Sequence, residues 1–128
     1  MKQSKDLIVT IFGATGDLTS RKLLPALQRL YTQKQISEKT LIVALGRKDY
    51  DTTSYLAYMQ QMSSQTLDLD LLKQLVVYHQ MDITDENQYE SLTTRIASYK
   101  NAETRELFYL AIAPELFPSV SKSINQSK

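Results

Sequence analysis

The chain has 128 residues, with 15 basic and 14 acidic side chains, one histidine and no cysteine. This length fits one domain with a real hydrophobic core, and the near balance of charges favours neither a nucleic-acid partner nor a membrane surface. Disulfides and thiolate sites are excluded, and a single histidine gives no basis for a metal site, so we expect none. No apolar run reaches the roughly 18 residues of a membrane span, and no leader sequence is apparent. We therefore expect a cytoplasmic protein.

The first predicted element is the most informative part of the chain. Residues 7–12 are apolar and β-branched and end at Gly13, which predicts a buried strand. A helix to about residue 33 follows a predicted tight turn over residues 17–21. Gly13 permits a sharp bend after the strand, and Gly16 lets the backbone approach a pyrophosphate. The amides of about residues 15–18 would then face the phosphates, with hydroxyl donors from Thr15 and Ser20. The alternative is an ordinary tight turn between a strand and a helix.

A second buried strand, residues 41–45, ends in a pair of cations. Gly46 is followed at once by Arg47 and Lys48, where an NAD-specific fold has an acidic residue. Arginine can hold a phosphate through two parallel hydrogen bonds. Arg47 therefore predicts recognition of a 2′-phosphate, which makes NADP the expected coenzyme. The alternatives are a solvated surface arginine and, for Lys48, a simple pair with Asp49.

The remaining elements continue the alternation of strands and helices. In chain order we expect a helix over residues 52–62 capped by Thr52 or Thr53, a short helix over 67–75, a strand over 76–81, a helix beginning at Thr84, a strand over 107–112, and a last helix opened by Pro114 to Pro118.

Three positions in this part of the chain bear on function. Asp82 and Ile83 follow the third strand, where a chain can reach an adenine, although Asp82 is equally suited to capping a turn. His79 lies among apolar neighbours within the strand, so we expect it to be structural. The chain shows no Ser-His-Asp set and no metal-ligand spacing, and we predict no catalytic residue in it.

The alternating order predicts an α/β fold with a parallel sheet covered by helices on both faces. Right-handed crossovers would place the strands in the order 3-2-1-4, as in a Rossmann-like sheet. Such a fold has about six strands, and four are visible here. We therefore expect a fragment, truncated before the remaining strands and with the fourth strand at an open edge.

Residues 13–27, Gly-Ala-Thr-Gly-Asp-Leu-Thr-Ser-Arg-Lys-Leu-Leu-Pro-Ala-Leu, resemble the coenzyme fingerprint of the glucose-6-phosphate dehydrogenases, G-x-x-G-D-L-A-x-[KR]-K-[LI]-x-P. Residues 44–47 and 107–114 resemble the ends of that family's second and fourth strands. The departure is Thr19, where the family has alanine. The resemblance covers nearly the whole chain and implies that residues 1–128 are an N-terminal NADP-binding domain. The family's catalytic histidine motif and its substrate and dimerisation domain are not in this sequence.

The family oxidises glucose 6-phosphate at C1 to 6-phosphoglucono-lactone in the pentose phosphate pathway, with hydride transfer to NADP. The resemblance implies that NAD is possible as a second coenzyme, that the full-length enzyme is a homo-oligomer, and that Lys22 faces the substrate. The coenzyme-binding residues that it implies are Gly13, Ala14, Thr15, Gly16, Asp17, Leu18, Thr19, Ser20, Arg47, Asp82 and Ile83. This chain alone is predicted to be inactive.

Two other functions fit the residues less closely. A stand-alone NADP-binding or NADP-sensing module would explain why catalytic residues are missing. An atypical short-chain reductase has a similar glycine turn, but it needs a Tyr-x-x-x-Lys pair, and no tyrosine of this chain has a lysine four residues later.

Overall fold

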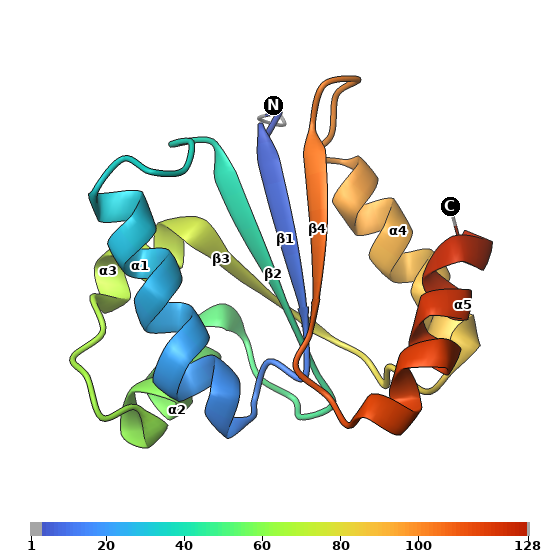
Figure 1. Ribbon diagram of the computed structural model, residues 1–128, viewed down its shortest axis with the longest axis horizontal. Coiled ribbons are helices and arrows are strands. Elements are labelled where there is room, and N and C mark those ends of the chain that lie inside the picture. The colour runs from blue at the N-terminus through green and yellow to red at the C-terminus, as the bar shows by residue number, and fades with distance from the viewer. Residues whose placement is uncertain (1–3, 128) are drawn as a thin grey trace.

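A parallel sheet of four strands lies between two layers of helices (Figure 1). The computed structural model describes residues 4–127. In chain order the elements are β1 (Leu7–Phe12), the π-helical turn η1 (Thr19–Leu23), α1 (Leu24–Thr32), β2 (Thr40–Gly46), α2 (Thr52–Met62), α3 (Leu69–Leu75), β3 (Val76–Gln80), the 3₁₀ turn η2 (Glu86–Gln88), α4 (Tyr89–Ala97), β4 (Arg105–Leu110), the 3₁₀ turn η3 (Pro114–Leu116) and α5 (Phe117–Ser127).

The strand order is β3-β2-β1-β4, and every pairing is parallel, as the sequence predicts. In the register, Ile11 lies beside Ala44 of β2 on one side and beside Tyr109 of β4 on the other. The carboxyl ends of all four strands therefore meet at one edge of the sheet, at the bottom of Figure 1.

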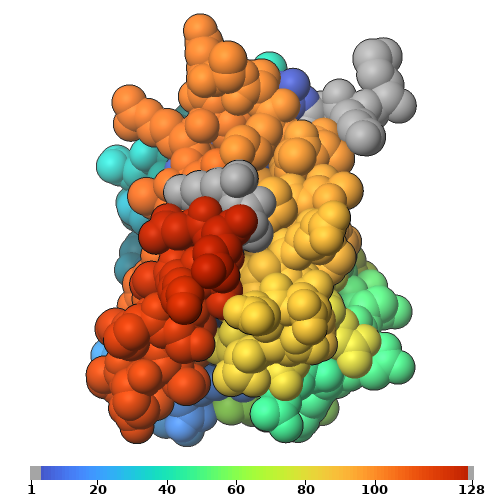
Figure 2. All heavy atoms as spheres, turned by 90° about the vertical axis from the view of Figure 1, so that its right-hand side faces the viewer, coloured from blue at the N-terminus to red at the C-terminus, as the bar shows by residue number. Residues whose placement is uncertain are grey.

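The apolar residues of the central strands divide between two cores, one on each face of the sheet. In the first core, Val9 and Ile11 face α1, α2 and α3. In the second core, Ile8 and Phe12 face α4 and α5. This alternation follows from the two-residue period of a strand. Every residue of β2 is buried, which explains why its sequence is continuously apolar rather than alternating. Figure 2 shows α4 and α5 side by side over the second core.

The helical segment after the glycine turn begins earlier than the sequence predicts. It starts at Asp17, where a tight turn to Arg21 was expected, and it contains the π-helical turn η1 before α1. The helix can begin before Pro25, which has no N–H and whose ring crowds the carbonyl four residues earlier, because η1 is a wider π-helical turn. The wider turn accommodates it, and the amide of Leu24 donates to the carbonyl of Thr19.

Two predicted caps are wrong, in both cases because an aspartate nearby takes the position. Asp51, not a threonine, caps α2, and its carboxylate accepts a hydrogen bond from the amide of Ser54 at 2.8 Å. Asp85, not Thr84, caps η2, the 3₁₀ turn that leads into α4. Carboxylates are strong acceptors for the unpaired amides of a first helical turn.

The fourth strand lies two residues earlier than predicted, at Arg105–Leu110. It has a neighbour on one side only, and it exposes Leu107 (56%) and Tyr109 (39%) on the α1 face of the sheet. The apolar run at residues 107–112 thus extends past the strand. Residues 111–113 form the connection to η3 at the carboxyl edge.

Candidate functional site

The loops that follow β1, β2 and β3 enclose a hollow of about 450 Å³ at the carboxyl edge of the sheet. This is the edge at which open α/β sheets bind their ligands. Its lining residues are Gly13, Thr15, Leu45, Gly46, Arg47, Lys48, Met81 and Ile83. Four predicted coenzyme residues, Gly13, Thr15, Arg47 and Ile83, therefore come together here although they are far apart in the sequence.

The two glycines of the first loop differ in what surrounds them. Gly13 has φ = +83°, and a β-carbon there would collide with the carbonyl oxygen of Ala111 beside it. At Gly16 a β-carbon would find only ordinary contact, 3.4 Å from the carbonyl oxygen of Gly13. Gly13 is thus required by the backbone, whereas the open side of Gly16 leaves a place for a ligand.

The helical segment begins directly after Gly16, and its first hydrogen bond runs from the amide of Ser20 to the carbonyl of Gly16 at 3.2 Å. The amides of Asp17, Leu18 and Thr19 consequently belong to the first turn, where a helix has no internal acceptors for them. Such an N-terminus favours a phosphate through both its amides and its dipole. The amide of Gly16 is already used within the turn, where it donates to the carbonyl of Gly13 at 3.1 Å.

Three of the residues predicted to bind the coenzyme have side chains that are turned into the protein. Ala14, Thr19 and Ser20 are fully buried. The hydroxyl of Thr19 donates to the carbonyl of Gly13 at 3.2 Å, and that of Ser20 donates to the carbonyl of Asp17 at 3.1 Å. The expectation of a hydroxyl donor from Ser20 does not match this orientation, because the early start of the helix turns Ser20 inward. Lys22, in contrast, is exposed one turn further along.

The second loop presents Arg47 at the end of β2. Arg47 is exposed and lines the hollow. The ammonium of Lys48 lies over the ring of Tyr58, 5.2 Å from its centroid, in a cation–π arrangement. The alternative considered for Lys48, an ion pair with Asp49, is absent among the ion pairs of residues 4–127. Both cations line the hollow, and the ammonium of Lys48 also contacts the Tyr58 ring.

The third loop contains Asp82 and Ile83. The carboxylate of Asp82 accepts hydrogen bonds from the amide and the hydroxyl of Thr84, at 2.9 and 2.6 Å. These two bonds, with a smaller contribution from the charge of Arg47, lower the pKa of Asp82 below its ordinary value. Asp82 thus caps the loop, which was one of its two predicted roles, while Ile83 lines the hollow.

The predicted coenzyme-binding residues leave out four residues that line the hollow: Leu45, Gly46, Lys48 and Met81. Each stands at a strand end or within two residues of one. Position at a strand end is therefore the signal that would have found them, because parallel strands bring their carboxyl ends together.

His79, the histidine of the chain, lies outside this hollow. Its Nδ1 is 3.2 Å from a guanidinium nitrogen of Arg95 on α4. Burial, and then the charge of Arg95, lower the pKa of His79, so the ring is neutral at pH 7. This position agrees with a structural role for His79 in β3.

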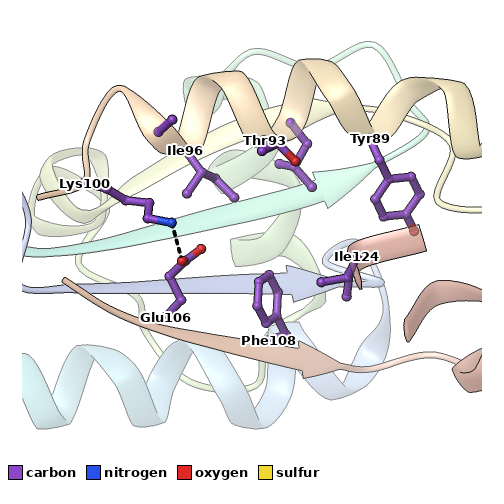
Figure 3. A pocket seen from close by; sticks show the side chains of 9 residues that line it. Tyr89, Thr93, Ile96, Lys100, Glu106, Phe108 and Ile124 are labelled. Atoms are coloured by element: carbon purple, nitrogen blue, oxygen red, sulfur yellow. Dashed lines mark ion pairs between the residues drawn. The ribbon is translucent and has the colours of Figure 1, made fainter. Parts of the chain in front are cut away.

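A second hollow of about 320 Å³ lies between α4, β4 and α5 (Figure 3). Tyr89, Ile96, Phe108 and Ile124 form much of its apolar lining, and the ion pair of Lys100 with Glu106 (2.6 Å) lies at its other end. It lies against the edge strand rather than at the loops of the carboxyl edge. The first hollow is therefore the candidate site.

Within residues 4–127, no group of three or more histidine, cysteine, aspartate or glutamate side chains is arranged to hold a metal ion. Across the same residues, no helix combines the length and the apolar character needed to cross a membrane.

Comparison with known proteins identifies the family. The family described as "Glucose-6-phosphate dehydrogenase, NAD binding domain" matches residues 10–128. A glucose-6-phosphate 1-dehydrogenase of Bacillus subtilis is 32% identical over 127 residues, covering 95% of this chain and 26% of the relative. One of Chlamydia pneumoniae is 33% identical over 131 residues, covering 94% and 26%. The chain thus spans about a quarter of the length of the curated relatives that it matches.

Solved structures agree on the fold. A glucose-6-phosphate dehydrogenase in complex with glucose 6-phosphate aligns with a TM-score of 0.84 at 24% identity, over 99% of this chain and 28% of the other. A glucose-6-phosphate 1-dehydrogenase from Mycobacterium avium aligns with a TM-score of 0.79 at 26% identity, over 99% and 28%. The resemblance read from the sequence is confirmed: this chain belongs to the family of NAD-binding domains of the glucose-6-phosphate dehydrogenases.

Proposed function

We propose that this chain binds NADP in the hollow at the carboxyl edge and forms the coenzyme half of a glucose-6-phosphate dehydrogenase. The observation that carries the proposal is the open side of Gly16 beside the first helical turn. Because Gly16 has no side chain, the space beside the amides of the first helical turn stays open, and such a space suits a diphosphate. Gly13 supports this arrangement by holding the turn against Ala111.

Different residues of the site would bind different parts of the coenzyme. The amides of residues 17–19 would hold the diphosphate, and Arg47 would pair with the 2′-phosphate through charge-assisted hydrogen bonds. Ile83 would offer an apolar surface to the adenine, with Asp82 keeping its loop in shape. NAD lacks the 2′-phosphate, so it would bind without the contribution of Arg47. NADP is therefore the preferred coenzyme and NAD the weaker one.

The reaction of the complete enzyme would be oxidation of glucose 6-phosphate at C1 to 6-phosphoglucono-lactone. When bound, NADP supplies the acceptor for the hydride that leaves C1. Lys22, which is exposed in η1, would face the sugar phosphate. We propose residues 1–128 as the N-terminal domain of a homo-oligomeric enzyme whose remaining length holds the substrate and dimerisation domain and the catalytic base.

The experiment is a calorimetric titration of the 128-residue chain with NADP and with NAD, with its fold checked by circular dichroism. The proposal predicts saturable binding that is tighter for NADP. A folded chain that binds neither coenzyme would overturn it.

A second assay separates a coenzyme domain from a small complete enzyme. NADPH absorbance is followed with glucose 6-phosphate, NADP and the purified chain, and no turnover is expected. A base within hydrogen-bond reach of the C1 hydroxyl is needed for this reaction, and His79 instead contacts Arg95. Turnover that disappears in His79→Ala would show that His79 is the catalytic base and would contradict its structural role.

A further inference from the structure

Each of the three loops around the hollow has one backbone carbonyl that accepts a hydrogen bond from a tyrosine hydroxyl. All three bonds are 2.7 Å long: Tyr55 to Ala14 in the first loop, Tyr78 to Lys48 in the second, and Tyr89 to Ile83 in the third. The three loops follow three different strands, and the same kind of tyrosine-to-carbonyl hydrogen bond is present in each.

The three tyrosines come from regular elements behind the loops. Tyr55 lies on α2, Tyr78 on β3 and Tyr89 at the start of α4, and their exposed fractions are only 0%, 5% and 1%. Figure 3 shows Tyr89 on α4, beside the second hollow. Burial raises the pKa of all three hydroxyls, to about 12 for Tyr78 and for Tyr89. The phenols therefore stay protonated at neutral pH and act as donors.

Neighbouring rings hold these tyrosines in place. The rings of Tyr55 and Tyr78 are stacked with centroids 5.0 Å apart, and the ring of Tyr50 meets Tyr78 edge-on at 5.8 Å. On the other face of the sheet, Tyr89 stacks on Phe12 at 6.3 Å. A buried ring with few torsions keeps its hydroxyl in one place. The helices on both faces of the sheet thus place a tyrosine hydroxyl donor at the carboxyl edge.

Gly46, at the end of β2, leaves room for one of these hydroxyl donors because it has no side chain. A β-carbon on Gly46 would lie 2.5 Å from the hydroxyl oxygen of Tyr78 and 3.0 Å from a methyl group of Thr15. Gly46 therefore makes room for the Tyr78 hydroxyl to reach the carbonyl of Lys48. The bond fixes the backbone directly after Arg47, the residue proposed to meet the 2′-phosphate.

We propose that Tyr55, Tyr78 and Tyr89 are positioning residues that each hold one loop in its coenzyme-binding conformation. The inference rests on the proposed function, because the loops are those of the proposed NADP site. A loop that populates its binding conformation only part of the time weakens affinity by that fraction. Each hydroxyl therefore controls a separate part of the same ligand: the diphosphate for Tyr55, the 2′-phosphate for Tyr78 and the adenine side for Tyr89.

The test uses Tyr55→Phe, Tyr78→Phe and Tyr89→Phe in the 128-residue chain, each of which removes one oxygen and keeps the ring. Tyr31→Phe is the matched control, because Tyr31 packs against the first core from the far end of α1. The first readout is hydrogen exchange of the free chain, followed by mass spectrometry. We expect faster exchange in the loop that each variant releases, and no change in these loops in the control.

The second readout is titration with NADP and with NAD. Tyr55→Phe and Tyr89→Phe should weaken both coenzymes by about three- to tenfold, which is the range for one lost hydrogen bond. Tyr78→Phe should weaken NADP more than NAD, because it releases the backbone beside Arg47. A general loss of stability would not produce this split between the coenzymes.

The outcomes separate this inference from the proposed function. If the wild-type chain binds neither coenzyme but the three variants exchange faster in their own loops, the proposed function is wrong and the tyrosines still hold the loops. If the wild-type chain binds NADP and the variants match Tyr31→Phe in both readouts, the positioning role is overturned. Should Tyr55→Phe fail to fold, the other two variants decide the question.

Discussion

The carbonyl oxygen of Ala111 stands where a β-carbon on Gly13 would have to lie. The two backbones meet because the amide of Ala111 donates to the carbonyl of Phe12 at 2.9 Å, which continues the pairing of β1 with β4 past the end of the strand. Gly13 also has φ = +83°, a conformation that other residues rarely adopt. The first glycine of the turn therefore belongs to the packing of the sheet.

Gly13→Ala should lower the free energy of unfolding by about 2–4 kcal/mol, because strain at positive φ adds to a collision with backbone that cannot move aside. Denaturant unfolding followed by circular dichroism measures this difference. A variant within about 0.5 kcal/mol of the wild type would show that the ends of β1 and β4 separate easily.

Gly16→Val should abolish coenzyme binding and leave the domain folded. A β-carbon at this position meets only the carbonyl oxygen of Gly13, at an ordinary 3.4 Å, so the added side chain extends into the space proposed for the diphosphate. Calorimetric titration and circular dichroism of the same sample give the answer. Normal binding would place the phosphate site elsewhere. An unfolded variant would show that glycine at position 16 is needed for the backbone conformation of the fold.

Arg47→Ala should weaken NADP more than NAD, by about ten- to a hundredfold, since a hydrogen bond to a charged group contributes about 1.5–3 kcal/mol. The matched control is Arg29→Ala, which removes the same charge from an exposed position on α1. Titration of both coenzymes against both variants measures the effect. An equal loss for NADP and NAD would remove the 2′-phosphate role of Arg47.

Part of the stability of the chain should depend on the ionised carboxylate of Asp51. Hydrogen bonds from the amide and the hydroxyl of Ser54 lower the pKa of Asp51 below its ordinary value of 3.8. A lowered pKa in the folded state means that the stabilisation is complete above 3.8 and is lost as the pH falls through the lower folded value. The wild type should therefore lose stability as the medium is acidified below about pH 4.

Asp51→Asn keeps an acceptor oxygen for the amide of Ser54 and removes the charge. Its unfolding free energy should start lower at pH 7 and decline less steeply on acidification than that of the wild type. Asp51→Ala loses the acceptor as well and should be less stable than either across the whole range. Denaturant unfolding at a series of pH values checks this order, and parallel curves for Asp51→Asn and the wild type would contradict it.

Local patterns in the sequence were enough to predict the fold and to single out two residues, Gly13 and Arg47, that line the hollow. Strands 7–12 and 76–81 and the helix over 52–62 agree with the structure to within a residue, because each has a clear period and a clear end signal. The order 3-2-1-4 followed from the alternation of strands and helices, from right-handed crossovers and from the strand order of Rossmann-like sheets. Gly13 and Arg47 were both singled out because each stands within two residues of the end of a predicted strand.

What only the tertiary structure decided depends on contacts between distant parts of the chain. The hydroxyl of Tyr55 reaches a carbonyl 41 residues away, and that of Tyr78 one 30 residues away. No local period encodes such a bond, so both tyrosines look like ordinary core residues in the sequence. The start of β4 at Arg105 is set by its pairing with Leu7 of β1. A strand's register is chosen by its partner, and a donor's target is chosen by the fold that brings the two together.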